Sequence, residues 1–196
     1  MKIKRLVIAG LVATAAIVPA AAALAGRHSN RSVGLVQQVR NATRAFQDVN
    51  QAIAAGYTSL GACVSGPDEG AMGIHYGGYP IDDGVLRPDQ PEFLIYEQRG
   101  GQLNLVGVEY LQLAAAWTGP PPVLVGQQFQ FVDAPNRYGL DPFYELHVWA
   151  WKNNPKGTFA DWNPRVSCDQ YTGDSRATQH QGEASHGVER TLMHLP

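Results

Sequence analysis

The sequence is poor in cysteine, in basic residues and in long apolar runs, and each shortage excludes a class of protein. Only two of its 196 residues are cysteine, and CxxC, HxH, HExxH and GxSxG are absent, so it has no metal or nucleophile motif of fixed spacing. The 15 Lys and Arg form no tract beyond residue 25. This argues against a nucleic-acid partner, because such binding needs clustered positive charge. No later stretch approaches the roughly 20 apolar residues of a membrane span.

The first 25 residues have the pattern of a secretory signal peptide. A cationic start with Lys2, Lys4 and Arg5 precedes an apolar run over residues 6–18 and an alanine-rich end that closes at Ala25. The run is too short for a convincing membrane span, and the residue directly after the cut is not cysteine, so we expect neither a membrane anchor nor a lipid anchor. The sequence therefore predicts an exported protein, periplasmic or extracellular.

The mature chain is acidic and contains both cysteines. Removing the three basic residues of the signal from the total of 15 leaves 12 against 17 acidic residues, a formal charge of −5. Small molecules, metal ions and proteins remain as partners. In an oxidising compartment, pairing of Cys63 with Cys168 is the default, and the long loop it closes would contribute roughly 4–5 kcal/mol. The alternative, a reactive thiol, lacks a motif.

The periodicity of the mature chain predicts one helix followed by strands. Residues 32–55 have the 3.6-residue period of an amphipathic helix that Gly56 can end, with apolar positions Val33, Val36, Val39, Phe46, Val49 and Ile53. The pattern then changes to period 2 in "AMGIHYG", "EFLIYEQ", "LNLVGVEYLQL", "QFQFVDA" and "FYELHVWAW", which turn-rich segments separate.

No second helix of comparable strength lies between these segments, so crossover connections are hard to build and an antiparallel sheet is favoured. The fold class we predict is α+β, with the N-terminal amphipathic helix packed on a mostly antiparallel sheet or small open barrel. Residues 26–170 form one globular domain in this interpretation, and the polar segment 171–196 is predicted to be a disordered tail.

The stretch "PFYELHVWAW" places Glu145 and His147 in the same alternating row as Phe143, Trp149 and Trp151. Other expected strands repeat this arrangement, because Glu97 follows Ile95 by two positions, Glu109 lies in a row that includes leucines, and His75 has glycines two positions away on each side. An isolated carboxylate in an apolar row faces a large desolvation cost unless it is protonated, paired, metal-bound or solvated through a cleft.

Several such groups suggest one shared site. Imidazole and carboxylate together are common ligands of zinc, copper, iron and manganese, so we expect a His/Glu-lined pocket for a divalent transition metal, with ligands His75, Glu97, Glu109 and His147. A metal-dependent oxidoreductase or hydrolase would use such a site. The alternatives stay open: the opposite rows, such as Leu146 with Val148, are apolar enough to be the core face, and buried His–Glu pairs also occur as structural hydrogen bonds.

The segments "GAMGIHYG", "PEFLIYEQ", "LVGVEYLQ" and "LHVWAWKNNPKGTFADWNPRVSC" resemble a family of exported bacterial proteins described only as uncharacterised. The resemblance extends from about the helix to Cys168 and implies export but no activity. It places six residues inside recurring segments of that family: His75, Glu97, Glu109, His147, Cys63 and Cys168. The segments with histidine and acidic residues also look like cupin strands, but the HxH pair and spacing of cupins are absent.

A second function class is a non-catalytic binding module. Here Trp149, Trp151, Phe159 and Trp162 would form an aromatic surface for a sugar, peptide or protein. Core packing is the other interpretation of these side chains.

The new amino terminus offers a separate metal site. Cleavage after Ala25 would create Gly26-Arg27-His28, in which the terminal amine, two backbone amides and the His28 imidazole can bind Cu(II) or Ni(II) in a plane. The alternative is an inert leader.

Overall fold

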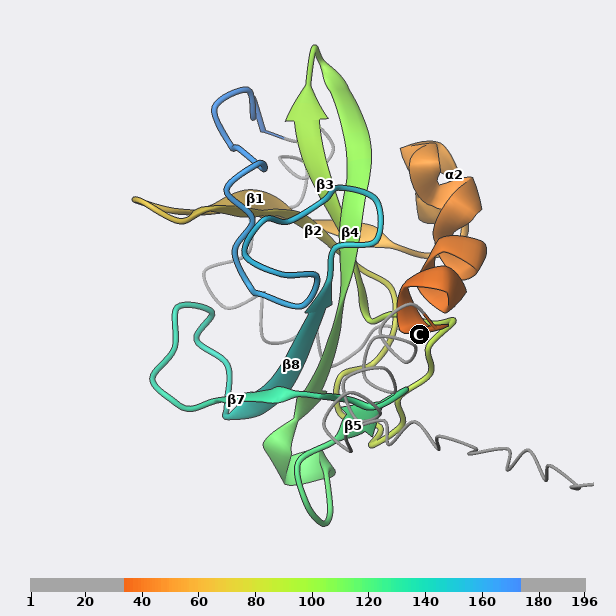
Figure 1. Ribbon diagram of the computed structural model, residues 1–196, viewed down its shortest axis with the longest axis vertical. Helices are drawn as coiled ribbons and strands as arrows, with labels where there is room; N and C mark the ends of the chain where they lie inside the picture. The colour runs from red at the N-terminus through yellow and green to blue at the C-terminus, as the bar shows by residue number, and fades with distance from the viewer. Residues whose placement is uncertain (1–33, 174–196) are drawn as a thin grey trace, which may run out of the picture.

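The structure is a computed structural model that describes residues 34–173 (Figure 1). The expected signal peptide, His28 and the part of the expected tail beyond residue 173 lie outside the described residues. Six strands form one antiparallel sheet in the order β1-β2-β3-β4-β8-β7. Their bounds are β1 Thr58–Gly66, β2 Gly70–Gly77, β3 Phe93–Arg99, β4 Gln102–Leu113, β7 Gln130–Val132 and β8 Phe143–Val148, and a hairpin of β5 (Val123–Leu124) and β6 (Gln127–Gln128) lies outside the sheet.

The sheet is curled into a half-barrel. In Figure 1 the long strand β4 runs roughly vertically, while β1 and β2 run across it. Irregular register interrupts the β1–β2 pairing after Ser59 and Val64, and the β3–β4 pairing after Ile95. Such bulges bend a strand and increase its twist, which explains the curl. Strand β1 was not expected, because its glycines and small polar residues hide any apolar alternation.

The helical segment is broken where the sequence predicted one continuous helix. Residues 34–43 are helical, a 3-10 turn η1 follows over Arg44–Gln47, and α2 spans Val49–Ala54. Asp48 interrupts the helix with an extended backbone, and its side chain accepts a hydrogen bond from the Asn50 N–H. Aspartate is a favoured N-cap residue, so this position begins a new helix. Gly56, with φ of 99°, ends it as expected.

The helical segment packs on one face of the sheet and forms the main core. Leu35, Val39 and Ala52 are fully buried there, against a row of strand residues that includes Leu146 and Val148. The row opposite His147 is therefore a true core face. The row that contains His147 is buried as well, so the alternation of this strand does not separate core from solvent.

The chain after β8 forms a covering segment, residues 149–169, over this second face. It returns to β2, where Asn163 pairs with Ala71 by two backbone hydrogen bonds. The Trp149 indole donates a hydrogen bond to the Ala160 carbonyl at 2.6 Å, which links the start of the covering segment to its middle.

Cys63 and Cys168 form a disulfide across a sequence separation of 105 residues, which confirms the predicted pairing. The bond joins the end of the covering segment to β1 and fits an oxidising compartment. Among residues 34–173, no helix is long and apolar enough to cross a membrane.

Candidate metal centre

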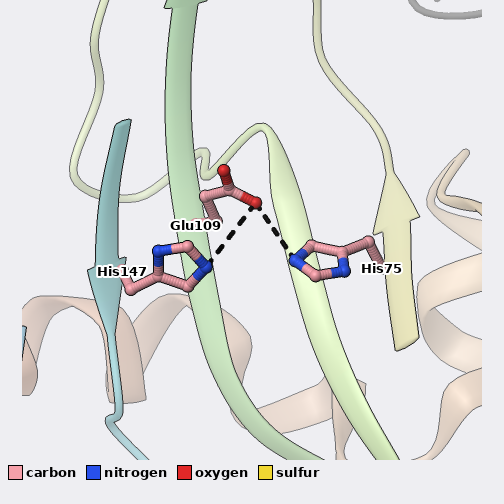
Figure 2. Close-up of side chains that lie close together, drawn as sticks. All are labelled: His75, Glu109 and His147. Atoms are coloured by element: carbon pink, nitrogen blue, oxygen red, sulfur yellow. Dashed lines mark ion pairs between the residues drawn. The ribbon is translucent and has the colours of Figure 1, made fainter. Parts of the chain in front are cut away.

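Three of the predicted ligands meet on the covered face of the sheet. His75 comes from β2, Glu109 from β4 and His147 from β8, and their side chains point toward one another (Figure 2). Glu109 stands directly opposite His147 in the β4–β8 register. His75 reaches over β3, beside the ring of Phe93, to meet them. Sheet register and the inward curl therefore bring together residues that are 34 and 38 positions apart.

The donor atoms are spaced closely enough for a metal ion. Glu109 Oε2 lies 3.2 Å from His75 Nε2 and 4.0 Å from His147 Nε2. The ligand atoms of all three residues lie within 4.8 Å of one another. A tetrahedral zinc site with bonds of roughly 2.1 Å places its donor atoms about 3.4 Å apart. Movements smaller than the length of one bond would therefore bring these donors into coordination geometry.

His147 is the most unusual member of the group, because its ring is fully buried and both its nitrogens lack a hydrogen-bond partner among the described residues. The carboxylates of Glu109 and Asp161 come within 4.0 Å and 3.7 Å of the ring nitrogens, which is beyond hydrogen-bond length. The ring stacks on Trp149 with an interplanar angle of 17°. Because buried polar atoms are almost always paired, the two unpartnered nitrogens call for an explanation, such as a bound water molecule or ion.

Two more carboxylates border the group. Glu145, also on β8, lies within hydrogen-bonding range of Glu109, while its Oε2 atom is buried without a partner. Asp161, in the covering segment, accepts a hydrogen bond from Gln130 Nε2 at 2.6 Å. Glu145, His147 and Asp161 form a second group of donor atoms within 4.8 Å of one another.

Neither Glu145 nor Asp161 was predicted as a ligand. Glu145 shares the alternating row of His147, which could have identified it. Asp161 lies in an irregular segment with no periodic signal.

Burial and mutual charge set the ionisation of the group. Burial raises the pKa of Glu109, but the neighbouring His147 and His75 outweigh it and the net pKa is lowered. Burial also lowers the pKa of His147, which favours the neutral imidazole that metals bind. Burial, followed by the charge of Glu109, raises the pKa of Glu145 to about 9. The lowered pKa of Glu109 favours its carboxylate form and the lowered pKa of His147 favours its neutral form, and these are the forms in which the two groups bind metals.

The structure does not bring the fourth predicted ligand, Glu97, into this group. Its carboxylate accepts hydrogen bonds from Lys152 Nζ at 2.5 Å and from the Ser167 N–H at 3.0 Å. Glu97 thus ties β3 to both ends of the covering segment. The ion pair and the backbone donor offset the cost of removing this carboxylate from water, so Glu97 follows the paired alternative and not the metal-bound one.

The four aromatic residues proposed as a binding surface are all at least partly buried. Trp149 is 4% exposed, and Trp151 and Phe159 pack against the main core. Trp151 leaves the row of His147 after β8 ends, and its indole donates to Thr43 Oγ1 on the helical side. Trp162 is half-buried beneath the Arg137 guanidinium, 4.6 Å from its ring centre. Each of these side chains has a packing role within the fold.

Comparison of the chain with models of protein families, with curated proteins and with solved structures found no match. Any functional conclusion therefore rests on the chemistry of the site.

Proposed function

We propose that this is an exported metal-binding protein that holds one divalent transition-metal ion between His75, Glu109 and His147. The observation that carries the proposal is the fully buried His147 ring, whose two nitrogens are unpartnered while one faces the Glu109 carboxylate. A metal at Nε2 would satisfy that nitrogen and neutralise the buried carboxylate at the same time.

The ligand set indicates the class of metal. Two imidazoles and one carboxylate, without a thiolate, match the ligands of catalytic zinc sites and of non-haem iron(II) sites. Such sites have three protein ligands and leave further positions for water or substrate. His147 is completely enclosed, whereas His75 and Glu109 are 7% and 5% exposed, so any solvent access to the group is on their side. We therefore propose that a water molecule or small ligand occupies the open position.

Metal titration of protein purified without a His tag tests the proposal. Metal-stripped protein is titrated with Zn(II) against a chromophoric chelator and with Co(II) by visible absorption, in a His28→Ala background that removes the amino-terminal candidate. One ion should bind per chain, and His75→Gln or Glu109→Gln should abolish tight binding.

Glu92→Gln is the matched control, because Glu92 is a buried glutamate beside β3 that lies outside both groups of donor atoms. It should bind metal like the parent protein. Failure of the parent to bind, or equal affinity in the parent and Glu109→Gln proteins, would reject the site.

A further inference from the structure

Asp161 and Gln130 form a polar chain that leads to the far side of the His147 ring. Gln130 Nε2 donates to Asp161 Oδ1 at 2.6 Å, and the same oxygen lies 3.7 Å from His147 Nδ1. The other ring nitrogen, Nε2, faces Glu109 and His75. The two nitrogens of one imidazole thus face two different carboxylates on opposite sides of the ring.

The chemistry of imidazole assigns different roles to the two sides. A neutral ring carries a proton on one nitrogen and a lone pair on the other, and only the lone pair can bind a metal. If Nε2 is the ligand atom, Nδ1 carries the proton and requires an acceptor. Asp161 Oδ1 is placed to be that acceptor. The 3.7 Å separation exceeds the usual length of a hydrogen bond by less than an ångström. A small rotation of the carboxylate would bring the two atoms into hydrogen-bonding distance, and a bridging water molecule would connect them without any movement.

A second metal ion at Nδ1 is the competing interpretation, because Glu145, His147 and Asp161 also bring their donor atoms together. That arrangement would require both nitrogens of His147 to be deprotonated if Nε2 also binds a metal. Asp161 is already engaged with Gln130, and Glu145 lies within hydrogen-bonding range of Glu109. A proton at Nδ1 needs no such additional deprotonation, so the acceptor role is favoured.

The covering segment holds Asp161 firmly enough for this role. The carbonyl of Ala160, the residue before it, accepts the Trp149 indole hydrogen bond at 2.6 Å. The carbonyl of Trp162, the residue after it, accepts a hydrogen bond from Asn154 Nδ2 at 2.9 Å. Both neighbours of Asp161 are thus fixed, and Gln130 of β7 fixes the carboxylate itself.

We propose that Asp161 is a positioning residue that keeps the His147 proton on Nδ1 and directs the Nε2 lone pair toward Glu109 and His75. The consequence for metal affinity rests on the proposed function, whereas the position of the proton in the metal-free protein rests on the closer contact, 3.7 Å from Nδ1 to Asp161 against 4.0 Å from Nε2 to Glu109. Carboxylate partners of this kind orient metal-binding histidines, and losing one typically weakens metal affinity by about 10- to 100-fold.

The first test reads the proton directly in the metal-free protein. Histidine labelled with nitrogen-15 distinguishes the two tautomers by NMR, and His147→Gln identifies the signal. The parent protein should show the Nδ1–H form, and Asp161→Ala should shift the ring toward the Nε2–H form. An Nε2–H form in the parent protein would overturn the inference, whatever the metal titration shows.

The second test compares Zn(II) affinity. Asp161→Ala should keep one ion per chain but bind it about 10- to 100-fold more weakly, and Asp161→Asn, which retains an acceptor oxygen, should lose less. Asp169→Ala is the matched control, because Asp169 is exposed in the same covering segment.

The outcomes separate the two proposals. If the parent protein binds no metal, the proposed function fails and the NMR result still decides the tautomer. If the parent binds metal and Asp161→Ala matches Asp169→Ala, the positioning role alone fails. Two tight ions in the parent, one of which depends on Asp161, would establish the second metal site instead.

Discussion

Replacing His147 with leucine should make the metal-free protein more stable and at the same time abolish its stabilisation by metal. Near neutral pH the buried ring is neutral, because burial lowers its pKa from 6.5. Both ring nitrogens are buried without a hydrogen-bond partner among the described residues. A leucine of similar size fills the position and leaves no unpaired polar atom. If His147 served only to pack the core, its replacement would lower the stability of the metal-free protein. If it serves to bind a ligand, its replacement should raise that stability.

The size of the effect follows from these two nitrogens. Each buried polar atom without a partner costs about 1–3 kcal/mol, and an imperfect hydrophobic fit costs up to about 1.5 kcal/mol. The two nitrogens together cost about 2–6 kcal/mol, so after the fit penalty we expect the free energy of unfolding of the metal-free variant to rise by about 0.5–6 kcal/mol, or roughly 1–24 °C in Tm. In the parent protein, free metal at about 100 times its Kd should add ~2.7 kcal/mol, and the variant should gain none of this.

Thermal and urea unfolding of the stripped and zinc-loaded proteins measure both effects. His75→Leu is the informative comparison, because the His75 ring lies 3.2 Å from the buried Glu109 carboxylate. Losing that partner should destabilise the metal-free protein by about 1.5–3 kcal/mol while also abolishing the metal-dependent gain. A destabilised His147→Leu protein without metal, or one that zinc still stabilises, would refute the reasoning.

Three further predictions concern the rest of the chain. Replacing Cys63 and Cys168 with serine should lower the free energy of unfolding by roughly 4–5 kcal/mol in urea titrations, because the disulfide joins residues 105 positions apart. Two free thiols in protein isolated from its native compartment would contradict the disulfide. Burial raises the pKa of Glu92, so the folded chain binds more protons than the unfolded chain above pH 4.5 and stability falls as pH rises through that window. Glu92→Gln should reduce this fall in stability curves measured across pH, with the contribution of Glu145 remaining, and an unchanged pH dependence would count against the Glu92 carboxyl as one of its causes. Once amino-terminal sequencing shows cleavage after Ala25, Cu(II) titration should reveal one tight site that His28→Ala lacks; equal stoichiometry and affinity in both proteins would dismiss it.

Local pattern was sufficient to identify most of the sheet and three of the clustered side chains. The alternation of side chains along a strand is a property of the strand itself, so the rows containing Glu109 and His147 could be identified without knowing their neighbours. The pairing of Cys63 with Cys168 followed from the scarcity of cysteine in a chain expected to be exported. Gly56 ended the helical segment because glycine readily adopts the positive φ needed there.

The helix break and the first strand were not predicted. Asp48 fits the polar face of one long helix as well as it fits the cap of a second, and packing decides between them. Strand β1 has little apolar alternation of its own and is stabilised by pairing with β2.

Only the tertiary structure decided which acidic residues share the site. Glu97 and Glu109 occupy similar rows, yet Glu97 meets Lys152 and Glu109 meets His75, because strand register and the path of the covering segment place their partners. Asp161 reaches His147 from an irregular segment held by long-range hydrogen bonds and a disulfide. The sequence by itself determined which side chains can share a face of a strand. Folding determined which of them meet, because register, curl and loop closure arise from contacts between residues distant along the chain.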